Sequence, residues 1–278
     1  MRLAGKIFWG TMSTLLAASC FDPPQFPIIP EIAYQSVRFV DVPDASPLEL
    51  STDSLVLEVS FKDGDGDLGI GSNESIVTSG SKKYFFNDRW YYTKDQMNCD
   101  DNPQDNVKRC YELRLEDLSK YVNYKLKRVP VNGSDTLKPF VKPYNCTNWQ
   151  VVRDRTGAVQ DTVYFQLNPY YNNIFVEFQV KEANTSCGSP PCFSKFDWSQ
   201  YQDYPNCEVQ GFDGRFPYLN TESLGPTPLA GVIKYSMPSP FFKTIFGART
   251  LRLRVYIVDR ELNRSNEILT PEFTLRPQ

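Results

Sequence analysis

The residues best suited to chemistry in this 278-residue chain are three aspartates that alternate with glycines. Asp63, Asp65 and Asp67 stand at every second position of the run Lys-Asp-Gly-Asp-Gly-Asp-Leu-Gly. The glycines permit a tight turn, which can direct several carboxylate oxygens toward one point. Ca²⁺ prefers about six to eight such oxygen ligands in a flexible cage. We therefore predict a calcium site here, against the alternative of an acidic turn whose carboxylates are solvated.

The aspartate spacing also matches the first half of an EF-hand loop, and Glu74 falls at the twelfth position of that loop. An EF-hand requires glycine at the sixth position, where this chain has Leu68. The flanking residues alternate as in strands, so we do not assign an EF-hand. Asp259 and Asn263, in a turn near the C-terminus, are candidates to complete the ion site. The alternative is ordinary turn chemistry, in which such side chains bond to nearby backbone.

The chain contains no histidine, which removes several classes of enzyme from consideration. Ser-His-Asp and Cys-His catalysis are excluded, as is zinc bound by histidine. A glycoside hydrolase would need two carboxylates in a cleft, and Glu177 and Asp197 are candidates among 33 acidic residues. Nothing in the sequence singles these two out. We therefore expect a non-enzymatic protein and keep a carboxylate-based glycoside hydrolase as an alternative.

Residues 1–19 have the features of a lipoprotein signal peptide. Two basic residues precede a mostly apolar run at 7–18, which is shorter than the roughly 20 residues of a membrane span. The ending Leu-Ala-Ala-Ser-Cys is similar to a lipobox, so we predict cleavage before Cys20 and lipidation of that cysteine. The proline-rich residues 20–32 would then form an extended tether. The alternative is an ordinary signal peptide with a cysteine there by chance.

Six cysteines remain after the predicted anchor is set aside. An even number in an exported chain indicates disulfides, whereas a zinc site would have no histidine to draw on. Sequence does not choose among the connectivities, and we favour Cys99 with Cys110 and, second, Cys187 with Cys192. The six predicted disulfide cysteines are Cys99, Cys110, Cys146, Cys187, Cys192 and Cys207.

Alternating apolar residues predict strands at both ends of the chain that follows the tether. The middle, at about 75–225, holds the six cysteines and weaker strand signals. We predict an all-β fold in which the two ends of 33–278 form one antiparallel sandwich and the middle is a long disulfide-stapled insertion. A separate small β domain is the alternative for the middle. The predicted strands are 32–42, 54–61, 83–92, 111–115, 163–167, 174–180, 231–237, 250–258 and 268–275.

Two loops carry a resemblance to known proteins. The acidic run resembles the loops of calcium-binding immunoglobulin-like (Ig-like) and cadherin-like modules, where an Asp-x-Asp-Gly-Asp run follows an early strand. The turn from Asp259 to Asn266 is similar to the last turn of bacterial Ig-like domains, with Leu262 at the usual glycine. With the lipobox, the whole chain resembles a class of Bacteroidota outer-membrane lipoproteins. This resemblance implies an Ig-like antiparallel β-sandwich, lipid-anchored to the outer membrane at the cell surface, and no particular activity.

The partners expected for such a protein follow from charge and aromatic content. The net charge of −3 argues against nucleic acid. We expect most of the aromatic residues in the middle to fill a core, except Phe193, Phe196, Trp198 and Tyr201, which could form an exposed binding surface. The leading hypothesis is an accessory subunit that binds an outer-membrane protein complex. The alternative is a glycan-binding module.

Overall fold

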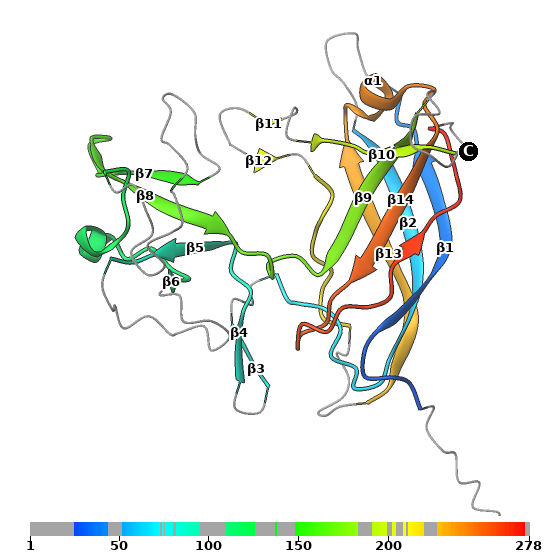
Figure 1. Ribbon diagram of the computed structural model, residues 1–278, viewed down its shortest axis with the longest axis horizontal. Helices are drawn as coiled ribbons and strands as arrows, with labels where there is room; N and C mark the ends of the chain where they lie inside the picture. The colour runs from blue at the N-terminus through cyan, green and yellow to red at the C-terminus, as the bar shows by residue number, and fades with distance from the viewer. Residues whose placement is uncertain are drawn as a thin grey trace, which may run out of the picture.

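The computed structural model of this protein describes most of the chain after the predicted tether begins. The described residues are 25–43, 52–72, 74, 76–79, 82–94, 109–125, 137, 148–182, 191–198, 202–203, 208–209, 211–219 and 227–275. Nearly all of their regular structure is strand in antiparallel sheets (Figure 1). The described helices are the short α1 (Phe242–Phe246) and the 3₁₀ helix η1 (Leu115–Lys120). The predicted all-β class is confirmed.

A three-stranded sheet contains the long strands from the two ends of the chain. Its order is β1-β2-β13, with β1 at Glu31–Val40, β2 at Asp53–Asp63 and β13 at Leu229–Ser239. The central strand β2 pairs along its whole length with β13. It also pairs with β1, whose register shifts once between Tyr34 and Ser36. The strand thus brings the start of the acidic loop to the end of a fully paired sheet.

A four-stranded sheet carries the C-terminal turn. Its order is β10-β9-β14-β15, with β9 at Ile174–Lys181, β10 at Phe193–Lys195, β14 at Leu251–Ile257 and β15 at Ile268–Leu269. The apolar alternation predicted for β14 is confirmed, because every second residue of that strand is fully buried.

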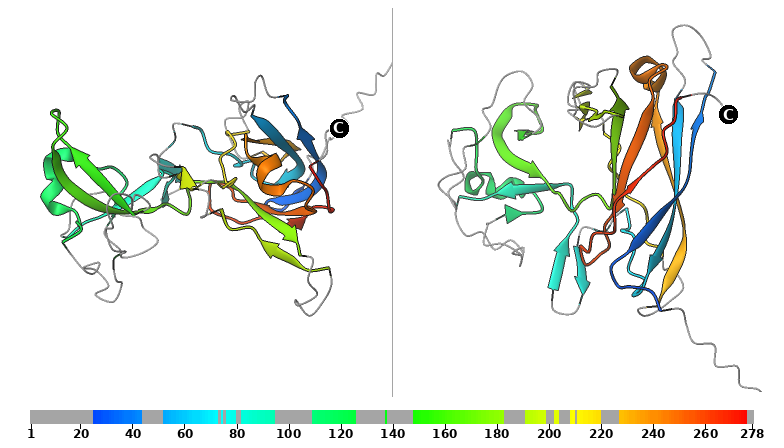
Figure 2. Two further views of the ribbon diagram at one scale, coloured as in Figure 1. Left: turned by 90° about the horizontal axis from the view of Figure 1, so that it is seen from above. Right: turned by 45° about the vertical axis from the view of Figure 1, so that its right-hand side comes forward.

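The two large sheets share one hydrophobic core, which explains why one face of each long strand is apolar. The sheets lie face to face, and α1 covers one end of them (Figure 2). Fully burying a large aliphatic side chain contributes about 1.5–3 kcal/mol, so this core is the main source of stability. Its central residues are Leu55, Leu57 and Val59 of β2, Val176, Phe178 and Val180 of β9, and Leu251, Leu253, Val255 and Ile257 of β14.

A second, smaller body is inserted between β2 and β9. It is built on a sheet of order β6-β5-β8-β7, with β5 at Arg89–Tyr92, β6 at Arg109–Cys110, β7 at Trp149–Arg153 and β8 at Val159–Leu167. We call these four strands the inserted lobe. It has aromatic-rich cores of its own and stands beside the large sheets in Figure 1. Its residues Trp90, Tyr91, Tyr92 and Trp149 are buried, as expected for aromatics of the middle that fill a core.

Two features of the middle and one of the C-terminal end differ from the sequence-based expectation. Strands β9 and β10 fall within the block 75–225 and belong to a large sheet. The block therefore leaves the large sheets twice, once before β9 and once after β10, and is not one continuous insertion. The reason is tertiary, because β9 pairs with β14, which lies some seventy residues later in the chain. The expected strand 111–115 is instead a short loop that leads into η1. The expected strand 268–275 is regular only in β15, followed by an isolated bridge between Leu251 and Phe273.

The remaining strands are short hairpins outside the two large sheets. One pairs β3 (Ile76–Ser79) with β4 (Lys82–Phe85), and the other pairs β11 (Gln202–Asp203) with β12 (Glu208–Val209).

Two of the six predicted disulfide cysteines lie in the described part of the chain. Cys110 ends β6 and Cys192 directly precedes β10, and both are disulfide-bonded. The other four cysteines and the predicted lipidation site Cys20 lie outside the described residues. The pairing of the six cysteines therefore stays a prediction.

The edge strand β1 is fastened to the other sheet by one amide side chain. The Ile32 N–H donates to Asn266 Oδ1 at 2.7 Å, and Asn266 Nδ2 donates to the Ile32 carbonyl at 2.9 Å. Asn266 lies two residues before β15. Its side chain therefore pairs with β1 in the way that a neighbouring strand would. It closes one side of the two-sheet body.

We predict that Asn266→Ala lowers the free energy of unfolding by about 1–3 kcal/mol, because it leaves two partly buried backbone groups of Ile32 unpaired. Urea unfolding followed by tryptophan fluorescence measures this loss. Gln35→Ala, which removes an exposed side-chain hydrogen bond from the same strand, is the control. Equal stability of the two variants would contradict the role given to Asn266.

Candidate metal centre

The acidic loop begins where β2 ends, and the structure brings its three aspartates together. Each of Asp63, Asp65 and Asp67 offers a carboxylate oxygen, and these oxygens all lie within 4.8 Å of one another. The turn depends on Gly66, whose φ of 68° lies in the left-handed region that favours glycine. The glycine and aspartate alternation in the sequence therefore folds into a cluster of carboxylates.

Five of the six oxygens of these carboxylates are buried without a hydrogen-bond partner. Asp63 has no exposed surface, and neither of its oxygens has a hydrogen-bond partner. Both oxygens of Asp67 and Oδ1 of Asp65 are likewise buried without a partner. A buried polar atom without a partner costs about 1–3 kcal/mol, and more when it is charged. Five such oxygens at one place are therefore the signature of a site that a cation would complete.

A fourth carboxylate reaches the same place from the other sheet. Asp259 follows β14 and has no exposed surface. Its Oδ1 accepts hydrogen bonds from the N–H groups of Asn263 at 2.7 Å and Glu261 at 2.9 Å. Its Oδ2 accepts from Asn263 Nδ2 at 2.9 Å. The Asp259 carboxylate is close enough to raise the pKa values of Asp63 and Asp67, although it is not among the three whose oxygens lie within 4.8 Å of one another. Asn263 holds it in position through these bonds.

The pKa values of Asp63, Asp67 and Asp259 show how poorly this site tolerates their charge. Burial, together with the charges of the neighbouring carboxylates, raises the pKa of Asp63 to about 7 and that of Asp67 to about 8. Burial also raises the pKa of Asp259 to about 6, although hydrogen bonds from Asn263 partly oppose this. Carboxylates this close and this dry do not all ionise near neutral pH unless a positive charge joins them.

The donor set fits calcium better than other common cations. All candidate ligands are carboxylate oxygens, which suit hard cations such as Ca²⁺ and Mg²⁺ and not zinc or copper. Mg²⁺ demands near-ideal octahedral geometry and keeps several waters, whereas a flexible loop of consecutive carboxylates suits the larger Ca²⁺. Asp63, Asp65 and Asp67 would hold the ion, and Asp259 would add charge from the opposite sheet.

Two leucines occupy positions where the related motifs have glycine, and the structure explains both. Leu68 is fully buried in the main core, so it fastens the acidic loop to the two sheets. Leu262 has a φ of 68°, a conformation that costs a non-glycine residue about 1–2 kcal/mol. Its side chain packs against Ile70 and Phe86, and this apolar contact offsets the strain.

Residues next to the candidate ion site also contact the segment that leads to the inserted lobe. Arg260, next to Asp259, donates to both carboxylate oxygens of Glu74 at 2.8 and 2.6 Å. Glu74 is therefore an ion-pair partner and not the twelfth ligand of an EF-hand loop. Arg215 donates to the backbone carbonyls of Glu74 and Phe86 at 2.7 and 3.1 Å. Sequence reasoning missed both arginines, because their partners are distant in the chain.

The chain leading from the predicted anchor touches the acidic loop directly. The Gly64 N–H donates to the Pro27 carbonyl at 2.8 Å. A side chain at Gly64 would meet the Phe26 carbonyl oxygen at 2.4 Å, so only glycine allows this approach. The candidate ion site therefore lies at the end of the molecule where the tether arrives.

The predicted aromatic binding surface takes a different form. Phe196 and Trp198 are partly buried and pack against the main core, so they do not form the outward platform expected from the sequence. The reason is the apolar surface of α1 and β9, where Phe246 contacts both rings. Phe193 stays on the outer face of the sheet, with the Arg252 guanidinium 4.0 Å from its ring centre. Tyr201 lies outside the described residues.

Of the two carboxylates considered for hydrolysis, Glu177 is held in a network of ion pairs. Glu177 forms ion pairs with Lys195 at 3.4 Å and Arg254 at 3.9 Å. Although burial opposes the change, a hydrogen bond from Gln179 and these two cations lower the pKa of Glu177. A lowered pKa is the reverse of what a general acid requires.

Comparisons of the chain with protein-family models, with curated proteins and with solved structures gave no match. Within the described ranges, no helix has the length and apolar character needed to span a membrane. The chemistry of the sites must therefore carry the functional argument.

We predict that calcium raises the melting temperature of the purified protein at pH 8 by about 5–10 °C when its concentration is well above the dissociation constant. Asp67→Asn should abolish this response. It should also make the calcium-free protein more stable than the wild type, because one repelling charge is gone. Glu261→Gln, which changes an exposed acid in the Asp259 turn, should keep the response. Differential scanning calorimetry tests all three, and a full calcium response in Asp67→Asn would refute the site.

The stability of the calcium-free protein should fall as pH rises from about 4 to about 8. In the unfolded chain the aspartates lose their protons near pH 4, whereas in the folded protein Asp63, Asp67 and Asp259 keep theirs to about pH 6–8. The folded state thus binds more protons over this interval, which lowers its stability as pH increases. Calcium displaces these protons, so its stabilising effect should be larger at pH 8 than at pH 5. Melting curves of dialysed protein at both pH values measure the difference, and equal calcium effects would contradict it.

Proposed function

We propose that this protein is a non-enzymatic lipoprotein, anchored through Cys20 at the outer-membrane surface, whose Ig-like sandwich is stabilised by calcium. It serves as an accessory subunit that binds an outer-membrane protein complex. The observation that carries this proposal is the set of five buried, unpartnered carboxylate oxygens of Asp63, Asp65 and Asp67. Such a set suits a structural ion in a display module.

The strand arrangement supports the Ig-like sandwich. Seven strands divide into a sheet of three and a sheet of four around one core. The chain passes between the sheets from β2 to β9 and again from β13 to β14, as in Greek-key sandwiches. The acidic loop follows the second strand, and the Asp259 turn follows the penultimate strand of the seven. The Ig-like modules that the sequence resembles carry an acidic loop and a turn at corresponding places.

The closed nature of the acidic cluster supports a non-enzymatic role. Strongly shifted pKa values often mark catalytic sites, because catalysis needs tuned acids in a cleft. Here the shifted carboxylates of Asp63 and Asp259 have no exposed surface, so a substrate would not reach them. An ion held between the ends of two strands stabilises the fold instead.

The position of the tether supports display at a surface. The segment that follows Cys20 reaches the body at the ion-site end, where Pro27 bonds to Gly64. The opposite end of the large sheets and the inserted lobe are therefore free to meet a partner. Calcium bound at the tether end would hold these surfaces in a fixed orientation relative to the anchor.

Membrane fractionation and co-purification test the proposal together. The wild-type protein should remain with the outer-membrane fraction and, after gentle detergent extraction, should bring one stoichiometric membrane-protein partner. Cys20→Ser should release it from the membrane, since a diacylated anchor is lost. Retention of Cys20→Ser in the membrane would contradict the anchor. Wild-type protein that purifies alone, even after cross-linking in intact cells, would contradict the accessory role.

A further inference from the structure

One edge of β9 pairs with different segments along its length, and a cavity lies where the pairing partner changes. Toward one end Gln179 pairs with Lys195 of β10, whereas toward the other end Ile174 bridges to Gly214. Between them, the Val176 N–H donates at 2.8 Å to the Asp213 side chain and not to a strand. The sheet edge is thus interrupted, and its neighbouring segments diverge around the interruption.

A cavity of about 350 Å³ occupies this interruption. Its size is at the lower end of the range for small-molecule sites. The cavity extends onto the outer face of the four-stranded sheet, and none of the four carboxylates of the candidate ion site lines it. The residues that line it are Phe175, Val176, Glu177, Phe178, Lys195, Phe196, Trp198, Gly211, Phe212, Asp213, Arg254, Tyr256, Arg264 and Glu267.

One wall of the cavity is a flat aromatic column. The rings of Phe175 and Tyr256 stack in parallel, with centres 4.6 Å apart and planes 9° apart. The Arg264 guanidinium covers Tyr256 at 3.7 Å from the ring centre. These two rings come from adjacent strands in register, so their orientation is fixed by the sheet. Such a column offers a rigid apolar face beside polar groups.

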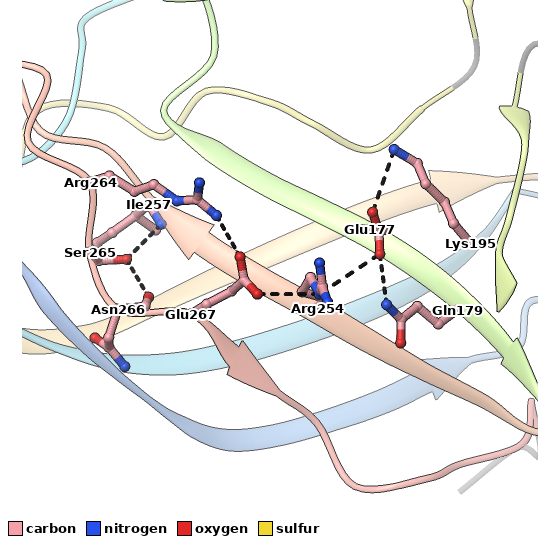
Figure 3. Close-up of polar contacts among 9 residues, drawn as sticks. All are labelled: Glu177, Gln179, Lys195, Arg254, Ile257, Arg264, Ser265, Asn266 and Glu267. Atoms are coloured by element: carbon pink, nitrogen blue, oxygen red, sulfur yellow. Dashed lines mark hydrogen bonds and ion pairs between the residues drawn. The ribbon is translucent and has the colours of Figure 1, made fainter. Parts of the chain in front are cut away.

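The remaining walls carry alternating charges in one connected network (Figure 3). Glu177 lies between Lys195 and Arg254, and Glu267 lies between Arg254 and Arg264. With Asp213, the lining holds three acidic and three basic side chains, so its formal charge is balanced. Carboxylates accept hydrogen bonds and guanidinium groups donate them in fixed directions. The lining thus suits a neutral ligand that is rich in both donors and acceptors.

The wall also contains a hydrogen-bond donor without an acceptor. The indole Nε1 of Trp198 is buried and has no hydrogen-bond partner among the described residues. Its ring is held in place by edge contacts to Phe178 and Phe212. The ring itself, fixed by these contacts, forms part of the cavity wall.

We infer that this cavity binds a neutral saccharide of one or two rings. A sugar ring is the ligand class that presents hydroxyl groups around its rim and an apolar C–H face to an aromatic column. An apolar ligand would leave six charged side chains facing it, and a charged ligand would meet an equal number of opposing charges. The inference is independent of the ion site and adds a ligand to the proposed surface module.

Ligand-observed NMR and calorimetry on the purified full chain test the inference. The probes are glucose, galactose, mannose, N-acetylglucosamine, maltose and lactose, with galacturonate and glucosamine as charged comparators. At least one neutral sugar should bind more tightly than both charged comparators. Glu177→Gln and Phe175→Ala should each weaken that binding about tenfold or more, through loss of a charged acceptor and of the stacking face respectively.

Glu272→Gln is the matched control, because Glu272 pairs with Lys181 near the same sheet but outside the cavity lining. It should leave the affinity unchanged. Circular dichroism melts test whether each variant is folded. If Phe175→Ala is unfolded, the affinity of Glu177→Gln alone tests the inference. The inference is overturned if no neutral sugar binds at concentrations on the order of tens of millimolar, if a charged sugar binds best, or if Glu177→Gln binds as the wild type does.

Discussion

The burial of carboxylates close to one another is the constraint on which this end of the fold depends. Asp63 closes β2, Asp65 and Asp67 follow it, and Asp259 arrives from β14 in the opposite sheet. Without a compensating charge, burial and repulsion raise the pKa values of three of these groups into the range of about 6–8. We propose that a divalent cation offsets this cost and links the two sheets.

The surrounding structure is organised to hold these carboxylates where they repel. Leu68 buries itself in the core directly after the last aspartate, and Leu262 accepts a left-handed backbone to pack beside Ile70. Arg260 then ties the Asp259 turn to Glu74 on the path toward the inserted lobe. The tether reaches the same loop through Gly64. One small region therefore contacts the predicted tether, the two sheets and the connection to the lobe.

The local alternation of apolar residues predicted most strands, whereas the pairing of strands and the orientation of side chains became known only from the structure. The alternation of 250–258 and 54–61 identified β14 and β2, and the acidic triad was evident from spacing alone. The sequence did not indicate that β9 leaves the middle block to pair with β14, because pairing partners are not encoded in local alternation. Asn263 was assigned as a ligand, but its role as a positioning group depends on the backbone of the turn. Phe196 and Trp198 were expected outside, yet the apolar surface supplied by α1 and β9 draws them inward.

The proposed ion site would stabilise the fold, and the proposed saccharide cavity would recognise a ligand. The first is closed and placed beside the tether, and the second opens on the outer face of the four-stranded sheet. A crystal structure of the protein grown with calcium, recorded with anomalous data, tests the central claim most directly. The account predicts one anomalous peak about 2.3–2.6 Å from oxygens of Asp63, Asp65 and Asp67. A well-ordered loop with no such peak, its carboxylates turned apart or bonded to water, would contradict it.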